Sequence, residues 1–332
     1  MAKGGAKRVI WSRLPGGMVM ASLQLREADR TTRVHARPGM PAHPAPVLFR
    51  RASETLGSDT RSLARIAPEE ASLGRIGALE VRLATSGVDL DHAQSLRYQV
   101  FYQEMTAQPD TQTLRTCRDA DAFDAICDHL LVLDHDCDGA GKVVGTYRLL
   151  RQEIAALHRG FYSQGEYDIA PVLAAHPDMR FLELGRSCVL APYRNKRTVE
   201  LLWHGIWAYV LRHRIDVMFG CASLPGADPD RLALPLSFLH HHAPAPEEWR
   251  ARAWEHLHVP MERLPCEGID TRAALASLPP LIKGYLRIGA GFGDGAVVDH
   301  QFGTTDVLVV LPVSRITARY IAHFGADAGR HG

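Results

Sequence analysis

The sequence has no apolar run that approaches the roughly 20 residues of a membrane-spanning helix, so a transmembrane protein is not expected. Its six cysteines form no CxxC pair, which argues against a disulfide framework and a zinc site and favours a reducing compartment. Opposite charges nearly cancel, at a formal +1, so no global field indicates a nucleic-acid partner. The 332 residues are enough for one or two domains with a substantial core.

Residues 1–75 are rich in Arg, Pro, Gly and Ala and show no sustained hydrophobic period, which predicts a disordered basic extension. Two short apolar patches, Val9–Trp11 and Met18–Met20, do not make a signal peptide. We therefore expect a cytoplasmic protein. The basic extension also allows a peripheral contact with the inner face of the cell membrane, although a solvated tail is the simpler interpretation.

The stretch Phe181–His213 predicts a strand, a basic loop and a helix in succession. Residues 181–190 are mostly apolar, and Pro192 ends the strand because proline cannot donate to a ladder. The loop Tyr193–Arg197 carries three cations, and Thr198 is the expected cap of a helix with one wide apolar face. A helix N-terminus beside cations favours a phosphate, although a solvated loop on a buried βα unit has the same pattern.

The ordered region, predicted to span residues 76–326, mixes strands and helices. Strands are expected at 79–84, 130–133, 142–150, 216–222 and 307–313, helices at 89–101, 280–287 and 316–324, and a glycine loop at 289–295. Asp89 is the expected cap of the first helix. The strands 130–133 and 142–150 flank an Asp- and Gly-rich turn and read as a hairpin. This order predicts an α/β (α+β) fold with a mixed, partly antiparallel sheet flanked by helices.

Four motifs then follow one another in a fixed order: Leu96–Phe101, Asp121–Leu130, Gly145–Leu149 and Glu183–Ser187. This series resembles the acyl-homoserine-lactone synthases, which have the GNAT fold of N-acyltransferases. Further motifs at 193–194, 219–223, 278–287 and 302–312 resemble more closely the L-ornithine Nα-acyltransferase family, which makes lyso-ornithine lipid. The resemblance implies a GNAT-like fold and transfer of a 3-hydroxyacyl chain from acyl carrier protein to the α-amine of L-ornithine.

The expected phosphate loop departs from the wider GNAT pattern, Gln/Arg-x-x-Gly-x-Gly/Ala. Arg194, Asn195, Lys196 and Arg197 stand where glycines would let the backbone approach a pyrophosphate. Coenzyme A carries such a pyrophosphate. The 4′-phosphopantetheine of acyl carrier protein offers one phosphodiester, which Lys and Arg side chains can bind. The sequence therefore favours a carrier-protein donor, with no bound cofactor and no metal.

The resemblance and the residue types together indicate the chemistry. An α-amine with a pKa of about 8 is largely protonated near neutrality, so its attack on a thioester needs a base. Glu183 is the expected base. The alternative is that Glu183 is a structural carboxylate at the strand edge, paired with Arg186. The strand end at Cys188–Val189 is expected to supply an N–H group to the oxyanion. The Cys188 thiol is expected to be buried and inert.

Other roles are implied by the resemblance. Arg97 or Arg186 is expected to bind the carboxylate of the amino acid, and Asp124, Asp128 or Asp306 its distal ammonium, with structural ion pairs as the alternative. The catalytic candidates are Glu183 and Arg186. The substrate-binding candidates are Arg97, Phe101, Asp124, Asp128 and Arg148. The donor-binding candidates are Cys188, Val189, Tyr193, Arg194, Asn195, Lys196, Arg197 and Thr198. The acyl groove is expected along Val100, Phe101, Leu149 and Phe161.

Two other hypotheses stay open. One is an acyl-homoserine-lactone-type or other long-chain amino-acid N-acyltransferase, and the other is a non-catalytic protein that binds acyl chains or membranes. Gly289–Gly295 superficially resembles the glycine motif that binds dinucleotides, but it follows a predicted helix rather than a strand. A dinucleotide site is therefore not expected there. His240–His242, His256 and His258 are expected to lie on a polar surface without a metal. No basic stripe interleaves with aromatic residues, so no nucleic-acid partner is expected.

Overall fold

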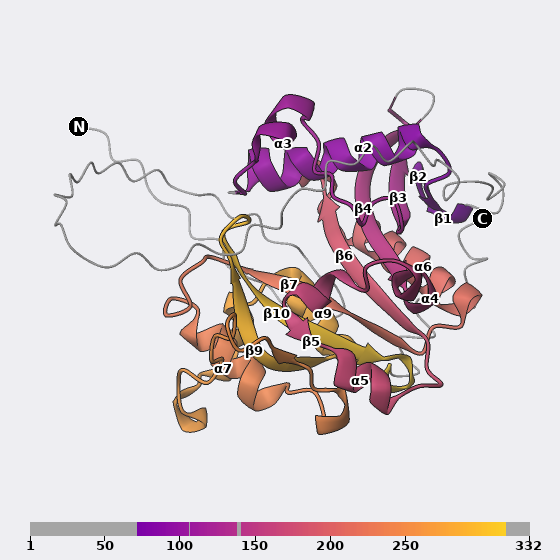
Figure 1. Cartoon of the computed structure of the whole chain (residues 1–332). Helices are drawn as coiled ribbons and strands as arrows, with labels where there is room; N and C mark the ends of the chain where they lie inside the picture. Colours follow the sequence, from indigo (N-terminus) through magenta and orange to yellow (C-terminus); the bar gives the residue numbers. More distant parts are fainter. Residues whose placement is uncertain (1–71, 106, 138–140, 317–332) are drawn as a thin grey trace, which may run out of the picture.

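The computed structural model describes residues 72–105, 107–137 and 141–316 (Figure 1). One sheet has the strand order β1-β2-β3-β4-β6-β7-β10-β9-β8-β5. The strands are β1 (Ser72–Ile76), β2 (Leu79–Leu83), β3 (Asp128–Asp134), β4 (Lys142–Arg151), β5 (Tyr167–Asp168), β6 (Phe181–Val189), β7 (Val217–Pro225), β8 (Arg252–Ala253), β9 (Gly291–Asp299) and β10 (Thr304–Pro312). Most neighbouring strands are antiparallel, which confirms the predicted mixed α/β fold.

Helices flank this sheet. They are α2 (Gly87–Tyr98), continued by a π-helical turn (Gln99–Glu104), α3 (Thr111–Thr116), α4 (Gln152–Leu157), α5 (Ala170–Ala175), α6 (Lys196–His213), α7 (Ala233–His242), α8 (Thr271–Ser277) and α9 (Pro280–Ile288). None of the helices in the described part of the chain has the length and hydrophobicity that a membrane span requires.

Helices α2 and α6 cover opposite faces of the sheet. Gly205 of α6 lies so close to the sheet that a Cβ atom there would be 3.1 Å from the Leu130 side chain. Leu130 stands opposite Tyr147 in the β3–β4 ladder, so Tyr147 also points to the α6 face. Successive side chains alternate along a strand, and Arg148 therefore points to the α2 face, toward the Asp124 carboxylate.

Strands β6 and β7 pair in parallel over a short distance and then separate. Phe181–Glu183 pair with Val217–Phe219, whereas β6 stays beside β4 and β7 beside β10 to their ends. A Cβ atom on Gly220 would lie 2.2 Å from the carbonyl oxygen of Leu184, so the backbones are in contact where the separation begins. The sheet is thus opened beyond this point.

Several expected elements are confirmed, including the β3–β4 hairpin and the β6–loop–α6 unit. Both predicted helix caps are wrong. Ser86 caps α2 by accepting a hydrogen bond from Asp89 N, and Asn195 caps α6 by accepting one from Thr198 N, each at 3.2 Å. In both helices an earlier polar residue takes the extended N-cap conformation, and the expected residue donates its N–H from the first turn.

Two boundaries also differ from the sequence analysis. Strand β1 begins at Ser72, inside the predicted extension, and pairs with β2. Most of the predicted glycine loop 289–295 belongs to strand β9, where Cβ atoms on Gly291 and Gly293 would lie 2.6 Å from Ala245 and 2.7 Å from Ala251. The glycines therefore serve close packing in a strand. Residues 1–71 and 317–332, with most of the expected extension and final helix, lie outside the described residues.

We predict that Gly220→Ala destabilises the protein by about 2 kcal/mol or more, because the added methyl group overlaps the Leu184 carbonyl and the backbones must move apart. Urea unfolding followed by circular dichroism would measure the loss. Gly87→Ala is the matched control, since nothing lies within 4 Å of a Cβ atom there. Equal stability of the two variants would show that β6 and β7 do not need this contact.

Candidate active site

A cavity of about 380 Å³ lies where β6 and β7 separate. Tyr147 and Arg148 both border it although they point to opposite faces, so the cavity passes through the opening in the sheet. Its apolar part is bordered from α6 and α9 by Val199, Leu202, Trp203, Pro280, Leu281 and Tyr285. Its polar part is bordered by Tyr162, Ser163, Glu183, Arg186, Asp299 and Asp306.

Three arginines and three aspartates form a buried ion-pair network on the α2 side of this opening. Arg97 pairs with Asp119 and Asp124, Arg148 with Asp121 and Asp124, and Arg186 with Asp119 and Asp121, at N–O distances from 2.6 to 3.4 Å. Each aspartate therefore bridges two arginines. The network joins α2, the segment before β3, and strands β4 and β6, and its charges cancel internally.

Burial alone would raise the pKa of Asp124, but Arg97 and Arg148 outweigh this effect and hold its pKa well below the usual range. The side chains of Arg97 and Asp124 are only 1% and 4% exposed, and neither borders the cavity. Their contacts are those of a structural ion pair, which was the alternative to substrate binding.

Arg186 is the network member that reaches the cavity most directly. It has a φ of 49° inside strand β6, next to the register shift against β4. Its guanidinium lies 5.1 Å from the ring centre of Tyr162 and 4.9 Å from that of Phe302. The left-handed backbone costs about 1 kcal/mol and lets the side chain leave the regular alternation of the strand.

Glu183 occupies the last position at which β6 pairs with β7. Its buried carboxylate accepts hydrogen bonds from Tyr162 N at 2.8 Å, Ser163 N at 2.7 Å and the Ser163 hydroxyl at 2.6 Å. Burial raises the pKa of Glu183, although these donors partly offset the effect. A carboxylate of raised pKa in a cavity wall is suited to accept a proton.

A second acidic group lies beside Glu183. One carboxylate oxygen each from Glu166, Asp299 and Asp306 lie within 4.8 Å of one another. The Cys221 thiol donates to Glu166 at 3.1 Å, and burial with the neighbouring Asp306 raises the pKa of Glu166 to about 7. Within the described ranges none of the three carboxylates forms an ion pair with Lys or Arg. This group is therefore complementary to a cation.

Cys188 and Cys221 both border the cavity, and burial raises the pKa of both thiols above the ordinary range. A thiol in such surroundings stays protonated, so neither cysteine is suited to be a nucleophile. All six cysteines are free, in agreement with the absence of a disulfide framework predicted from their spacing. Val189 also borders the cavity, next to Cys188 on β6.

The basic loop between β6 and α6 is partly neutralised by carboxylates. The Arg194 guanidinium donates to the Val189 carbonyl at 2.9 Å and pairs with Glu104. Lys196 Nζ lies 3.3 Å from a Glu200 oxygen. Arg194 borders the cavity, but much of the charge expected to face a phosphate is already paired within the protein.

The other loop residues have separate roles. Asn195 caps α6 through Thr198 N, and the Tyr193 hydroxyl donates to Asp134 at 2.7 Å. Arg197 makes no ion pair in the part of the chain that the structure describes. None of these loop residues borders the cavity.

The remaining substrate-binding candidates fall in different places. Phe101 borders the cavity and packs edge-on against Phe302, with ring centres 5.6 Å apart. Asp128 does not border it and instead accepts a hydrogen bond from Tyr209, with Arg151 Nε at 3.7 Å. Its contacts are those of a structural ion pair.

Sequence reasoning gave no role to Ser163 and Glu166, although both contact groups in the cavity wall. Ser163 lies in a short 3₁₀ turn (Tyr162–Gly165), and Glu166 follows that turn directly before the two-residue strand β5. Neither residue belongs to a recognisable motif. Their partners Glu183 and Cys221 are distant in sequence. A local pattern could not reveal this site, because only the folded sheet brings the segments together.

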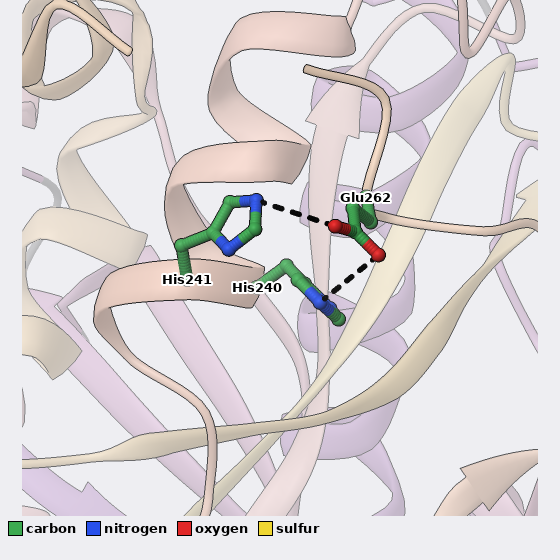
Figure 2. Close-up of side chains that lie close together, drawn as sticks. All are labelled: His240, His241 and Glu262. Carbon is green, nitrogen blue, oxygen red and sulfur yellow. Dashed lines mark ion pairs between the residues drawn. The ribbon is translucent and has the colours of Figure 1, made fainter. Parts of the chain in front are cut away.

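His240, His241 and Glu262 form a group outside the cavity at the end of α7 (Figure 2). Each Glu262 oxygen faces one imidazole, at 3.9 Å from His240 and 4.0 Å from His241. His241 Nε2 is also 3.1 Å from the Leu264 carbonyl and must carry a proton to bond it, which removes that nitrogen as a metal ligand. These contacts hold α7 against residues 262–264.

The mixed sheet that opens around a cavity agrees with the GNAT class of acyltransferases, to which the comparison of the sequence with known families assigns the chain. The family model described as "Acetyltransferase (GNAT) domain" matches residues 96–204. An L-ornithine N(alpha)-acyltransferase of Agrobacterium fabrum (strain C58 / ATCC 33970) is 57% identical over 263 residues, which are 79% of this chain and 90% of that protein. A protein of the same name from Rhizobium meliloti (strain 1021) is 56% identical, over 80% and 90% of the two chains.

The chain belongs to the L-ornithine Nα-acyltransferase family, and it is an acyltransferase. Among solved structures, the N-acyl amino acid synthase FeeM from uncultured soil microbes resembles it with a TM-score of 0.38 and 10% identity, over 71% of this chain and 91% of that one. The acyl-homoserine-lactone synthase BjaI has a TM-score of 0.38 and 14% identity, over 73% and 83%. These structural likenesses are weak, and the family assignment rests on the relatives of high identity.

We predict that Asp124→Asn destabilises the protein by about 3 kcal/mol, because it leaves two buried arginines short of one carboxylate. Since the native pKa of Asp124 is lowered, its stabilising effect is present above the unfolded pKa of about 4 and is lost as the pH falls below it. Urea unfolding at several pH values would show a smaller acid dependence in the variant.

Asp91→Asn is the control, because the Asp91–Arg118 pair is about 40% exposed on both sides and should contribute less than about 1 kcal/mol. Equal effects of the two substitutions would contradict a structural role for the buried network.

Proposed function

We propose that the protein transfers a 3-hydroxyacyl chain from acyl carrier protein to the α-amine of L-ornithine and so makes lyso-ornithine lipid. The observation that carries this proposal is the cavity through the sheet, which is apolar toward α6 and α9 and acidic toward β10. A long acyl chain would bind in the apolar part, and the cationic groups of ornithine would bind in the acidic part. The name of the closely similar relatives supports ornithine as the acceptor.

The polar part of the cavity suits the charges of ornithine. Glu166, Asp299 and Asp306 would bind the side-chain ammonium, which a neutral amino acid lacks. Arg186 would bind the carboxylate, because its side chain is 16% exposed at the cavity whereas Arg97 is enclosed in the ion-pair network. The α-amine would then lie near Ser163 and Glu183.

Proton transfer follows from that position. The neutral α-amine nitrogen attacks the thioester carbonyl, the new C–N bond forms, and the C–S bond breaks to release the pantetheine thiolate, which takes up a proton from water. The amine proton passes to Ser163 Oγ as the Ser163 hydroxyl proton passes to Glu183, which that hydroxyl already contacts at 2.6 Å. Glu183 is thus the proposed base, with Ser163 between it and the substrate.

The donor side of the proposal uses β6 and α6. N–H groups at Cys188–Val189 would stabilise the oxyanion of the tetrahedral intermediate. The 4′-phosphopantetheine phosphate would meet the N-terminus of α6, where Arg197 has no carboxylate partner among the described residues and Arg194 and Lys196 lie nearby. Because the product carries a long chain, we also propose a peripheral contact with the membrane during its release.

The test of this function is transfer by the purified protein. We expect 3-hydroxyacyl carrier protein and L-ornithine to give the Nα-acyl amide, detected by mass spectrometry. L-Norvaline has the same backbone without the side-chain ammonium and should react at least about tenfold less efficiently, as expected for a lost charged contact. An acyl-coenzyme A donor should also react less efficiently than the carrier protein. Equal use of ornithine and norvaline would contradict the acidic subsite.

We predict that Glu183→Gln lowers kcat at least about 100-fold, because the base is removed while the carboxylate shape is kept. In the wild-type protein kcat/KM should rise with pH as Glu183, whose pKa is raised, loses its proton. Glu183→Gln should remove this rise, and Ser163→Ala should weaken it.

The substitution Glu166→Gln distinguishes the proposed role of Glu166 in binding ornithine from the proposed role of Glu183 as the base. It should keep the pH-dependent rise assigned to Glu183 but reduce the preference for ornithine over norvaline. Glu267→Gln, at an exposed position outside the cavity, serves as a control with unchanged kinetics. A pH profile that depends on Glu166 and not on Glu183 would show that Glu166 is the base.

A further inference from the structure

Two aromatic rings lie against the guanidinium of Arg186. The Tyr162 ring belongs to the 3₁₀ turn before β5, and the Phe302 ring belongs to the turn between β9 and β10. The Arg186 Cζ atom is 5.1 Å from the centre of the first ring and 4.9 Å from that of the second. All three residues border the cavity, so the rings contact Arg186 where it faces a bound molecule.

The position of Phe302 is fixed by the turn that carries it. Asp299 Oδ1 accepts hydrogen bonds from Gln301 N at 2.8 Å and from Phe302 N at 2.9 Å. Gly303 then takes a left-handed φ of 67°, which leads the chain into β10. The tip of the hairpin rises toward α3 in Figure 1, where Gln108 N donates to Gln301 O at 2.7 Å. The turn is thus held to the end of β9 and to the connection between α2 and α3.

The Phe302 ring also packs against the π-helical turn that continues α2. Its centre is 5.6 Å from that of Phe101, in an edge-on arrangement, and 5.9 Å from that of Tyr102. An aliphatic side chain could fill this space, but it has no electron-rich face that attracts a cation. The feature that only an aromatic side chain provides here is the contact with Arg186.

The ion pairs of Arg186 are longer than the shortest ones of the other two arginines in the network. Its Nε atom is 3.3 Å from Asp119 and its Nη2 atom 3.4 Å from Asp121, whereas Arg97 and Arg148 each have a contact of 2.6 Å with an aspartate. Contacts of this length constrain the direction of the guanidinium weakly. A ring beneath the cation limits its rotation and leaves its N–H edge available to a carboxylate.

We propose that Phe302 is a positioning residue, whose ring holds the Arg186 guanidinium in the orientation that binds the carboxylate of the amino-acid acceptor. This inference rests on the proposed function, in which Arg186 binds that carboxylate. It adds that the β9–β10 turn, through Phe302, sets how tightly an acceptor with a carboxylate is bound. Tyr162 interacts with Arg186 through its hydroxyl as well as its ring, whereas Phe302 offers a ring alone. Phe302 is therefore the residue to substitute.

The experiment compares Phe302→Leu and Phe302→Tyr with the wild-type protein at a saturating concentration of acyl donor. The acceptors are L-ornithine and L-ornithinamide, in which a neutral amide replaces the carboxylate. Phe302→Leu should raise KM for ornithine about tenfold, the effect of one desolvated cation–ring contact, and change kcat less than about twofold. The constants for ornithinamide should stay the same. Phe302→Tyr keeps the ring face and should retain the KM of the wild type.

Two further measurements support this comparison. Ornithinamide is also measured as a competitor of ornithine, so that its affinity is obtained whether or not it is acylated. Phe238→Leu removes a buried ring from α7, outside the cavity, and should change the constants of neither acceptor. Urea unfolding of each variant separates a loss of stability from a change in binding.

Three results would overturn the inference. An unchanged KM for ornithine in Phe302→Leu would show that Arg186 is positioned without the ring. An equal loss with ornithine and ornithinamide would show that the ring shapes the cavity for any acceptor. A Phe302→Tyr variant as impaired as Phe302→Leu would show that the ring face is not the property that matters at this position.

Calorimetric titration with ornithine distinguishes the failure of this inference from the failure of the proposed function. A wild-type protein that acylates ornithine, with a Phe302→Leu variant that binds ornithine equally tightly, supports the function and contradicts only the role of Phe302. A wild-type protein that transfers no chain to any amine contradicts the function. Weaker binding of ornithine to Phe302→Leu would then still support the positioning of Arg186, and equal binding would contradict it.

Discussion

The separation of β6 from β7 is the constraint on which the rest of the site depends. The two strands are held together at Glu183 and Phe219, where Gly220 lets the backbones touch, and each then stays paired on its other side. Because the outer ladders are satisfied, the inner edges can part without losing the sheet. The opening joins the two faces, and a donor and an acceptor can meet within it from opposite sides.

The buried ion-pair network stabilises one side of this opening. Its three arginines belong to α2, β4 and β6, so the aspartates before β3 link a helix to two strands. A buried ion-pair network stabilises a protein little more than well-packed apolar residues would. Removal of one member destabilises the protein strongly, because a buried charge then lacks its partner. It therefore fixes geometry, and Arg186 extends that fixed geometry to the cavity.

Three of the residues that the sequence motifs indicated lie around the same cavity. Glu183, Arg186 and Arg148 border the cavity, and their motifs were recognisable because each lies on a strand with strong local signals. Arg97 and Asp124 are enclosed in the ion-pair network and do not border the cavity. The sequence did not distinguish them from the charged residues that do. Nor could it find Ser163 and Glu166, whose segment has no period and meets its partners only in three dimensions.

The class of fold, the family and the β6–loop–α6 unit can be read from the sequence, because they follow from strand and helix periods and from ordered motifs. How the charges are used depends on the tertiary fold. Arg194 and Lys196 are paired with Glu104 and Glu200, whereas Glu166, Asp299 and Asp306 gather without a cation in the described chain. The pairing of a charge depends on which segments the fold brings within a few ångströms, and local sequence does not contain that information.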